Sequence, residues 1–393
     1  MKKSLIALAA ATLIAGGGQA AADVVKFGVI APFSGPFAVW GKQFKDSIDA
    51  YQKLNGKMVN GHEIQVIWRD EGAGDASKSR QFAEELILRE KVQLLGGFAL
   101  TPDALSVAEV ITESKTPTII LNAATAIITR KSPYFLRVSM TVAQYVKPIG
   151  EWAPKNGIKT AFSMVSDYAP GHDAEGAFVN GFEKNGGKVV AKERVPLSVT
   201  DYSPYMERAL QSKADALYIF APAGAPSVAM VREFERRGLK AAGMKLLAGG
   251  EVQEIFLPSF GDSVLGTISS VHYTESNQRP ENIAFRKALN DLTGADTVPD
   301  MASVAAWDGM GLVYETVKAL GPRFTGDQAI EFMKNKTYNS PRGPIKFDPI
   351  ERDIIQNIYL RKVEMRDGKM INVDFATVEN VRDPWKDENP NAK

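Results

Sequence analysis

Short apolar runs alternate with amphipathic helical patterns along most of this chain, and this alternation restricts the fold more than any other feature. The first run, Val24–Ala31, precedes Phe44, Ile48 and Tyr51, which recur at the spacing of one helix face. We predict further strands at residues 64–68, 92–95, 117–121, 160–165, 188–193, 214–220, 245–248 and 268–273. Strand–helix–strand repeats build parallel sheets. The predicted fold class is therefore α/β, with doubly wound parallel sheets.

The alternation forms two series, and the second begins after Arg137, so the pattern is typical of one architecture used twice. Beyond both series, helical patterns occupy residues 282–292, 302–320 and 327–334. Strand patterns at 354–363 and 370–373 flank a turn at 366–368. The tail is polar and rich in Pro and Asn, so we expect residues 384–393 to be flexible.

The N-terminal segment has the order of a secretory signal. Lys2 and Lys3 supply positive charge, residues 5–15 are apolar, and residues 20–22 are small alanines suited to a signal peptidase. The apolar run is too short to anchor the chain in a bilayer. We expect residues 1–22 to be a cleaved signal peptide, the mature chain to begin near Asp23, and the protein to reside in the periplasm. A buried N-terminal helix is the alternative.

Composition excludes several classes of protein. The chain has no cysteine, which rules out disulfides, thiolate metal sites and a cysteine nucleophile. Its 47 Lys and Arg balance 46 Asp and Glu, and no basic cluster marks a phosphate-binding face, so we expect no nucleic-acid partner. Downstream of the signal, no uncharged apolar stretch approaches the length of a membrane span.

Catalytic signals are also missing. The three histidines, His62, His172 and His272, are isolated in sequence, and no zinc-protease, nucleophile-elbow, Walker or dinucleotide motif occurs. The carboxylate pair Asp70-Glu71 ends a predicted strand, and we interpret it as loop acids. We therefore predict no enzyme activity, no catalytic residues, no metal site and no cofactor. An exported enzyme whose acids and bases converge only in the fold stays open as an alternative.

Two predicted strand ends have the chemistry of a binding site. In doubly wound sheets, ligands bind beyond the carboxyl ends of the strands. Residues 96–102 (GGFALTP) place Thr101 as a candidate helix N-cap and Pro102 at the first helical position. A helix start there would attract a carboxylate, although a capped helix without ligand explains the motif equally well. The next strand end, residues 121–126 (LNAATA), is small and polar, and it includes Thr125.

Several segments together carry a resemblance. They are residues 29–36 (VIAPFSGP) with Trp40-Gly41, Asp70, residues 96–97, residues 122–126, residues 134–137 (YFLR), residues 167–171 (DYAPG), and Gly343-Pro344 with Phe347-Asp348. In this order, from about residue 24 to 373, the chain resembles the leucine/isoleucine/valine-binding protein family. That family comprises type I periplasmic solute-binding proteins of ABC importers. No single motif is specific, but their order and spacing are.

The resemblance implies two α/β lobes that close on a ligand and are joined by three crossings, near Val138, His272 and Gly343. The N-terminal lobe would comprise residues 23–138 plus 274–343, and the C-terminal lobe residues 139–273 plus 344–383. The implied partners are a small-molecule ligand and the membrane permease of an ABC importer, and we expect a monomer.

The resemblance also implies site residues. Thr101 and Thr125 would hold a ligand carboxylate, and the Ala123 carbonyl would accept from an ammonium group. Trp40 would form an aromatic wall, and Glu251, or its neighbour Gly250, would pair with the ammonium. The implied function is capture of a small amino-acid-like or carboxylate ligand of the branched-chain amino acid type.

Two departures from the family pattern open an alternative. Ala223, in residues 221–225 (APAGA), stands where amino-acid binders of the family often have a tyrosine, and Tyr168 lies two residues before the position of a second. This loss of polar aromatics favours a bulkier or aromatic carboxylate, or a short amide. Trp40, Phe98, Tyr168 and Trp307 are the candidates to stack on a ring, with packing in the core as the other explanation for each. A ligand-sensing domain is a further alternative.

Overall fold

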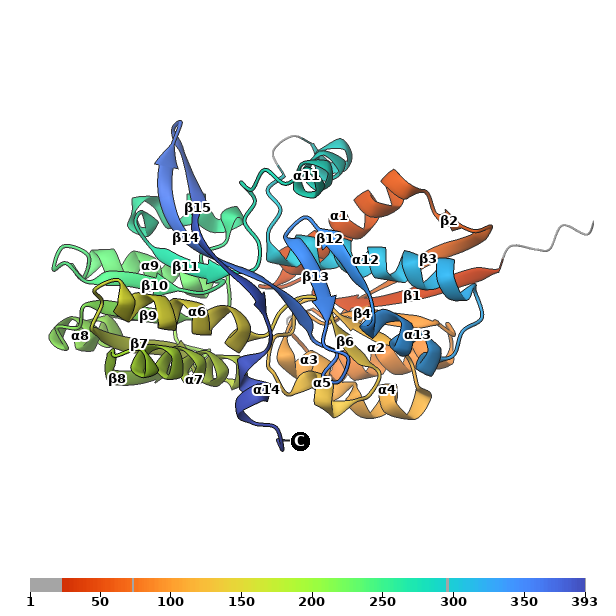
Figure 1. Cartoon of the computed structure of the whole chain (residues 1–393), viewed down its shortest axis with the longest axis horizontal. Helices are drawn as coiled ribbons and strands as arrows, with labels where there is room; N and C mark the ends of the chain where they lie inside the picture. The colour runs from red at the N-terminus through yellow and green to blue at the C-terminus, as the bar shows by residue number, and fades with distance from the viewer. Residues whose placement is uncertain (1–22, 73, 295–296, 393) are drawn as a thin grey trace, which may run out of the picture.

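A computed structural model describes residues 23–72, 74–294 and 297–392, and within them the chain forms two α/β halves side by side (Figure 1). The predicted signal peptide lies outside the described residues. The first half is built on a six-stranded sheet of order β2-β3-β1-β4-β5-β6. Its strands are β1 (Val24–Ala31), β2 (Met58–Val59), β3 (His62–Asp70), β4 (Leu94–Gly97), β5 (Thr118–Ile120) and β6 (Phe135–Arg137).

The second half is built on a nine-stranded sheet, with a path of order β12-β13-β14-β11-β10-β9-β7-β8 and β15 paired to β14. Its strands are β7 (Thr160–Ser166), β8 (Lys188–Val195), β9 (Ala216–Phe220), β10 (Lys245–Ala248), β11 (Ile268–Val271), β12 (Thr337–Ser340), β13 (Gly343–Phe347), β14 (Ile354–Arg366) and β15 (Lys369–Val381). The predicted strands are present, although β4 begins and ends two residues later than the apolar run suggested, because the sheet continues into Gly96-Gly97.

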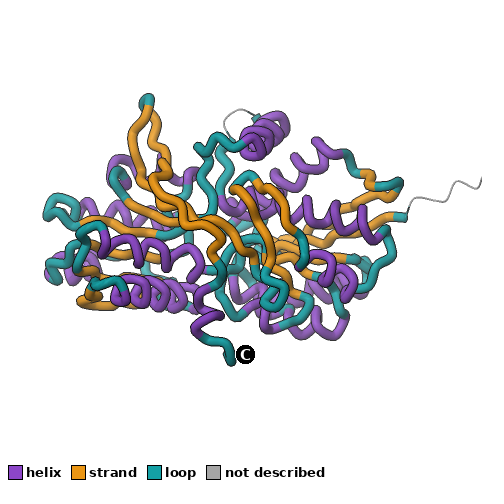
Figure 2. The backbone as a smooth tube through the Cα atoms, viewed as in Figure 1, coloured by secondary structure: helices purple, strands orange, loops and turns teal. Residues whose placement is uncertain are grey.

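Helices cover both sheets (Figure 2). Those of the first half are α1 (Ala38–Asn55), α2 (Ala76–Leu88), α3 (Thr101–Ser106), α4 (Ala108–Ser114), α5 (Ile128–Lys131), α11 (Pro280–Thr293), α12 (Met301–Leu320) and α13 (Gly326–Lys334). Those of the second half are α6 (Val142–Lys155), α7 (Ala169–Lys184), α8 (Ser203–Gln211), α9 (Ala225–Arg236) and α10 (Leu257–Phe260), with 3-10 turns at Glu254–Phe256 and Gly261–Val264. None of the helices in the described part is both long and apolar enough to cross a membrane.

The parallel register brings the carboxyl ends of the strands together. In the first sheet, β1 lies between β3 and β4, with Ala31 opposite Asp70 and Ile30 opposite Gly97. Gly97 has φ +110°, and a Cβ there would lie 2.1 Å from the Ile30 carbonyl oxygen, so the chain can turn at this strand end only with glycine. In the second sheet, Phe220 pairs with Val165. The loops that follow these strands therefore share one edge in each half.

Arg342 joins the segments that pass between the halves. Its guanidinium donates to the Val138 carbonyl at 2.8 Å and to the Ser139 carbonyl at 3.0 Å, and it pairs with Asp308 of α12 at 2.5 Å. We predicted a crossing near Gly343. The first hydrophobic core extends past that point, because it includes Ile345, Phe347 and Ile354.

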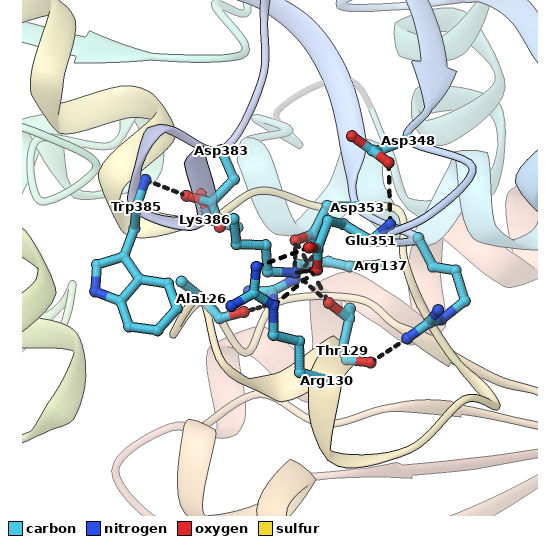
Figure 3. A network of polar contacts seen from close by, with 12 residues as sticks. Ala126, Thr129, Arg130, Arg137, Asp348, Glu351, Asp353, Asp383, Trp385 and Lys386 are labelled. Carbon is cyan, nitrogen blue, oxygen red and sulfur yellow. Dashed lines mark hydrogen bonds and ion pairs between the residues drawn. The ribbon is translucent and has the colours of Figure 1, made fainter. Parts of the chain in front are cut away.

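The C-terminal segment differs from the flexible tail that its composition suggested. Residues Pro384–Glu388 form α14, which packs against α6 and α7. Lys386 is only 3% exposed and pairs with Asp353, while Asp353 also pairs with Arg137 at 2.9 Å. Figure 3 shows this network between α14, α5 and the loop before β14. The polar composition of the C-terminal segment did not indicate this ion network, because the residues that Lys386 contacts lie far away in the sequence.

Candidate functional site

A cavity with about 460 Å³ of empty space lies where loops from both halves meet. The first half contributes Trp40, Ala99, Leu100, Thr101, Asn122 and Ala124. The second half contributes Tyr168, Pro170, Phe220, Ala221, Pro222, Ala223, Gly250 and Glu251. Met140, Val142, Tyr145 and Met301 complete the lining. Most of these residues follow the carboxyl end of a strand, where ligands bind in doubly wound sheets.

On the wall of the first half, polar groups lie beside an aromatic ring. The Thr101 hydroxyl donates to the Thr125 hydroxyl at 3.0 Å, and both side chains are buried. Trp40 stacks on Phe37 with ring centroids 5.2 Å apart. Its Nε1–H is buried and has no hydrogen-bond partner among the described residues. Because an indole nitrogen can only donate, this wall offers a free donor to a ligand acceptor.

Close packing fixes the position of Trp40. The next residue, Gly41, lies against the loop after β1, where a Cβ would come within 2.0 Å of the Pro32 carbonyl oxygen. The Asp70 carboxylate organises the same loop, because it accepts from the backbone N–H of Phe33 at 2.8 Å and of Ser34 at 3.3 Å. Asp70 thus has the structural role expected of a loop acid.

The wall of the second half combines aromatic and small residues. Tyr168 and Phe220 lie with ring centroids 6.3 Å apart. The residues between Phe220 and α9 have small side chains, and Ala223 among them lines the cavity. Tyr145 enters from α6, and a Cβ on Gly249 would lie 2.5 Å from its ring. This wall is therefore apolar and aromatic except near Glu251.

Glu251 follows β10 and is 1% exposed. Its Oε2 accepts from the Gly249 backbone N–H at 2.5 Å. Burial raises the pKa of Glu251 to about 8, although backbone N–H groups of residues 249, 251 and 221 favour the ionised form. Around neutral pH, most of the protein therefore carries a neutral Glu251, which can donate a hydrogen bond as well as accept one.

The cavity has little charge of its own. Among its described lining residues, Glu251 is the one acidic side chain, and none is lysine, arginine or histidine. Burial, and secondarily the nearby Glu251, raises the pKa of Tyr145 and of Tyr168 above the ordinary value, so both phenols are neutral. Among the residues described, no group of His, Cys, Asp or Glu has the arrangement of a metal site.

The two halves touch around the cavity. Ala223 of the second half belongs to the core of the first, and Ala124 of the first half packs against a core of the second. The Ala126 backbone N–H donates to the Asp173 carboxylate of α7 at 3.2 Å. Burial raises the pKa of Asp173 to about 6, while this N–H opposes the shift. The two halves therefore contact each other beside the cavity.

Five of the predicted site residues line the cavity, namely Trp40, Thr101, Tyr168, Ala223 and Glu251. Thr125 lies behind Thr101 as its hydrogen-bond acceptor. Phe98 is packed in the first core with φ +63°. The Ala123 carbonyl, predicted to face an ammonium group, accepts instead from Arg137 at 3.2 Å. Trp307 contacts the rings of Tyr51 and Phe285, at 4.8 and 5.0 Å, and does not line the cavity.

The predicted helix cap at Thr101 is wrong in detail. Leu100 is the N-cap of α3, and Thr101 is the first helical residue, so its hydroxyl is free to bond Thr125. The sequence analysis also missed Tyr145, Phe220, Asn122 and Met301. Tyr145 lies on α6, whose two prolines, Pro148 and Pro154, hide the helical pattern. Phe220 ends a buried strand, and its apolar neighbours give no signal of a site.

Comparison with known proteins agrees with this geometry. The model of the family described as periplasmic binding protein matches residues 24–369. The chain is 41% identical over 387 residues to Leu/Ile/Val-binding protein homolog 6 of Brucella melitensis, and the match covers 98% of this chain and 99% of the relative.

Solved structures are similar over nearly the whole chain. A solute-binding protein of an ABC transporter from R. palustris, in complex with 4-hydroxybenzoate, is 43% identical with a TM-score of 0.89, covering 92% of this chain and 98% of that one. A solute-binding protein of an ABC transporter from Rhodopseudomonas palustris BisB5, in complex with 3,4-dihydroxybenzoic acid, is 40% identical with a TM-score of 0.88. The match covers 93% of this chain and 99% of that one. A leucine-binding protein from Thermotoga maritima shares the fold. It is 21% identical with a TM-score of 0.79, and the match covers 90% of this chain and 99% of that one. This chain therefore belongs to the periplasmic binding protein family and is a solute-binding protein of an ABC transporter.

Proposed function

We propose that this protein captures a single-ring aromatic carboxylate, of the hydroxybenzoate class, between its two lobes. The observation that carries the proposal is the cavity itself, whose walls are Trp40, Tyr145, Tyr168 and Phe220 and include the unpartnered Trp40 Nε1–H. Flat rings bury apolar area against aromatic side chains, and a carboxylate needs donors. The hydroxybenzoate complexes of relatives at 40–43% identity support this ligand class.

Capture would proceed by closure of the lobes. In our proposal the ligand first meets the wall of the first lobe, and the second lobe then closes by a hinge motion. Closure excludes water, which strengthens the hydrogen bonds to the ligand carboxylate. The closed form would dock on a membrane permease as an exported, monomeric receptor without catalytic activity. The lobe bounds predicted from the sequence, residues 23–138 plus 274–343 and residues 139–273 plus 344–383, are part of the same proposal.

A branched-chain amino acid is the second candidate ligand. The relatives that are 41% identical are named as Leu/Ile/Val-binding protein homologues, and Glu251 could pair with an ammonium group if it ionised. The cavity favours the aromatic ligand, because Ala223 replaces a polar aromatic and the Ala123 carbonyl is occupied by Arg137.

Calorimetric titration of protein refolded free of ligand tests the proposed function. We expect 4-hydroxybenzoate and 3,4-dihydroxybenzoate to bind with dissociation constants of roughly 10 μM or tighter. Leucine, isoleucine and valine should give no heat at the same concentrations. Binding of these amino acids without binding of the aromatic acids would overturn the proposal in favour of the second candidate. Mass spectrometry of any small molecule that co-purifies gives an independent answer.

Trp40 provides a sharper prediction about the site. Trp40→Phe keeps an aromatic ring but removes the unpartnered Nε1–H. We expect affinity for 4-hydroxybenzoate to fall by roughly tenfold to a hundredfold, the usual cost of losing a hydrogen bond to a charged group. The matched control is Trp307→Phe, because Trp307 packs against Tyr51 and Phe285 away from the cavity. Equal affinities of the two variants would place the carboxylate elsewhere.

A further inference from the structure

The one acidic side chain in the cavity poses a chemical question, because the proposed ligand is itself an anion. Glu251 lies on the wall of the second half, whereas Trp40 and Thr101 lie on the wall of the first. A ligand that spans the cavity must therefore present different groups to the two walls. The indole N–H of Trp40, a donor without a partner, suits the carboxylate. The group that faces Glu251 has to be something else.

We propose that Glu251 recognises a hydroxyl group on the ring of the ligand and so makes the protein selective for hydroxylated over unsubstituted benzoates. The inference rests on the proposed function and adds the chemistry of one end of the site. A ring hydroxyl both donates and accepts, so it can bond a carboxyl group in either protonation state. A second carboxylate could bond only the protonated form, and an ammonium would gain a full ion pair only with the ionised form.

The backbone around Glu251 orients its carboxyl group. Gly249 and Gly250 follow β10 directly, and the Gly249 N–H holds Oε2 at 2.5 Å. The backbone N–H groups of Glu251 itself and of Ala221 also stabilise the carboxyl group. Glu251 lines the cavity, and its carboxyl oxygens have further lone pairs, and an O–H when protonated, for a ligand. The group is therefore a preorganised hydrogen-bonding partner.

Glu251 forms no ion pair with the titratable neighbours named next. The titratable groups that influence it or respond to it are Tyr145 from α6, Tyr168 before α7, Tyr218 in β9 and Arg361 in β14. Arg361 pairs instead with Glu254 at 2.8 Å. Because burial raises the pKa of Glu251 to about 8, the neutral acid adds no second negative charge beside a bound benzoate.

Selectivity follows from the free-energy cost of burying a polar group that has no hydrogen-bond partner. When benzoate binds, the free part of the Glu251 carboxyl group is closed in the cavity without a partner. Sites that hydrogen-bond a ligand hydroxyl reject the analogue that lacks it much more strongly than sites that only enclose a ring. We therefore expect wild-type protein to bind 4-hydroxybenzoate at least tenfold more tightly than benzoate.

The test is the ratio of the benzoate to the 4-hydroxybenzoate dissociation constant, measured by calorimetry for wild type, Glu251→Met and Glu251→Asp. Methionine keeps the volume without hydrogen bonding, and aspartate keeps the acid but withdraws it from the ring. Both variants should lower the ratio to near one, mainly by weakening 4-hydroxybenzoate. Glu175→Gln is the control, because Glu175 is a buried acid paired with Arg194 and does not line the cavity. Its ratio should equal that of wild type.

The outcomes separate this inference from the proposed function. If wild type binds neither acid, the proposed function fails. If wild type binds both equally, or if a folded Glu251→Met or Glu251→Asp protein keeps the wild-type ratio, the role of Glu251 is overturned while the proposed function stands. Should the methionine variant fail to fold, because it leaves the Gly249 N–H unpaired, the aspartate variant alone decides.

Discussion

Replacing Arg342 with methionine is expected to lower the free energy of unfolding by about 3–5 kcal/mol, the range measured when one partner of a buried ion pair is removed. Arg342 is 1% exposed. Its guanidinium contacts the Asp308 carboxylate through Nη2 at 2.5 Å and Nε at 3.0 Å, and it donates to Gln356 at 3.0 Å. Burial raises the pKa of Asp308, and Arg342 counters that shift. Methionine would leave this carboxylate buried without a cation.

Two backbone carbonyls would also lose a bond to Arg342 in the same variant, although the Ser139 carbonyl keeps the Gln356 side-chain donor at 2.8 Å. Val138 and Ser139 lie where the chain first passes between the halves, and their carbonyl oxygens both accept from Arg342. Urea unfolding followed by fluorescence measures the loss. Arg323→Met is the control, because the Arg323 side chain is 83% exposed and its surface ion pair with Asp23 should contribute less than about 1 kcal/mol. A loss at Arg342 no larger than this control would contradict the assigned role.

Much of the fold was predictable because the pattern of burial is local. Strands such as β1 and β9 are continuous apolar runs, and their following helices show the helical period, so the parallel α/β class follows from the sequence. The short strands β2, β6, β12 and β13 were missed. They have two to five residues, and no continuous apolar run marks them. Pairing with a neighbour, rather than local preference, makes them strands.

The candidate site was predictable only in part, for a related reason. Loops after parallel strands can be located from the sequence, which is how Thr101 was nominated. The family resemblance and the departures from it added Trp40, Tyr168, Ala223 and Glu251. Whether a side chain in such a loop faces the cavity depends on packing between distant segments. Phe98 turns into the core, and the Ala123 carbonyl is taken by Arg137. Neither outcome leaves a trace in the local sequence.

The second large effect concerns the ion network of the C-terminal segment. Asp353 is 1% exposed and pairs with both Arg137 and Lys386, which are themselves buried (Figure 3). Burial, together with the nearby Asp353 carboxylate, raises the pKa of Asp383 to about 7, so this second acid is only partly ionised at neutral pH. Asp353 is thus the acid paired with Arg137, and it shares Lys386 with Glu351, whose carboxylate lies 3.3 Å from Nζ. Thr129 of α5 completes the contact by accepting from Lys386.

Asp353→Asn keeps the shape of the side chain but removes its charge, and we expect the free energy of unfolding to fall by about 3–5 kcal/mol. Asp387→Asn, on the exposed face of α14, is the control and should change stability by less than about 1 kcal/mol.

The double variant Asp353→Asn with Lys386→Met identifies the cause of that loss. Removing Lys386 together with Asp353 returns the net charge of the network to its wild-type value, although Arg137 still loses its paired acid. The double variant should therefore be more stable than the sum of the single losses predicts, by about 1–3 kcal/mol. Urea unfolding of the four proteins in this cycle gives the coupling energy. Strictly additive losses would mean that Lys386 and Asp353 act independently, and α14 would then be held by its apolar contacts, chiefly the packing of Trp385 against the core of the second half.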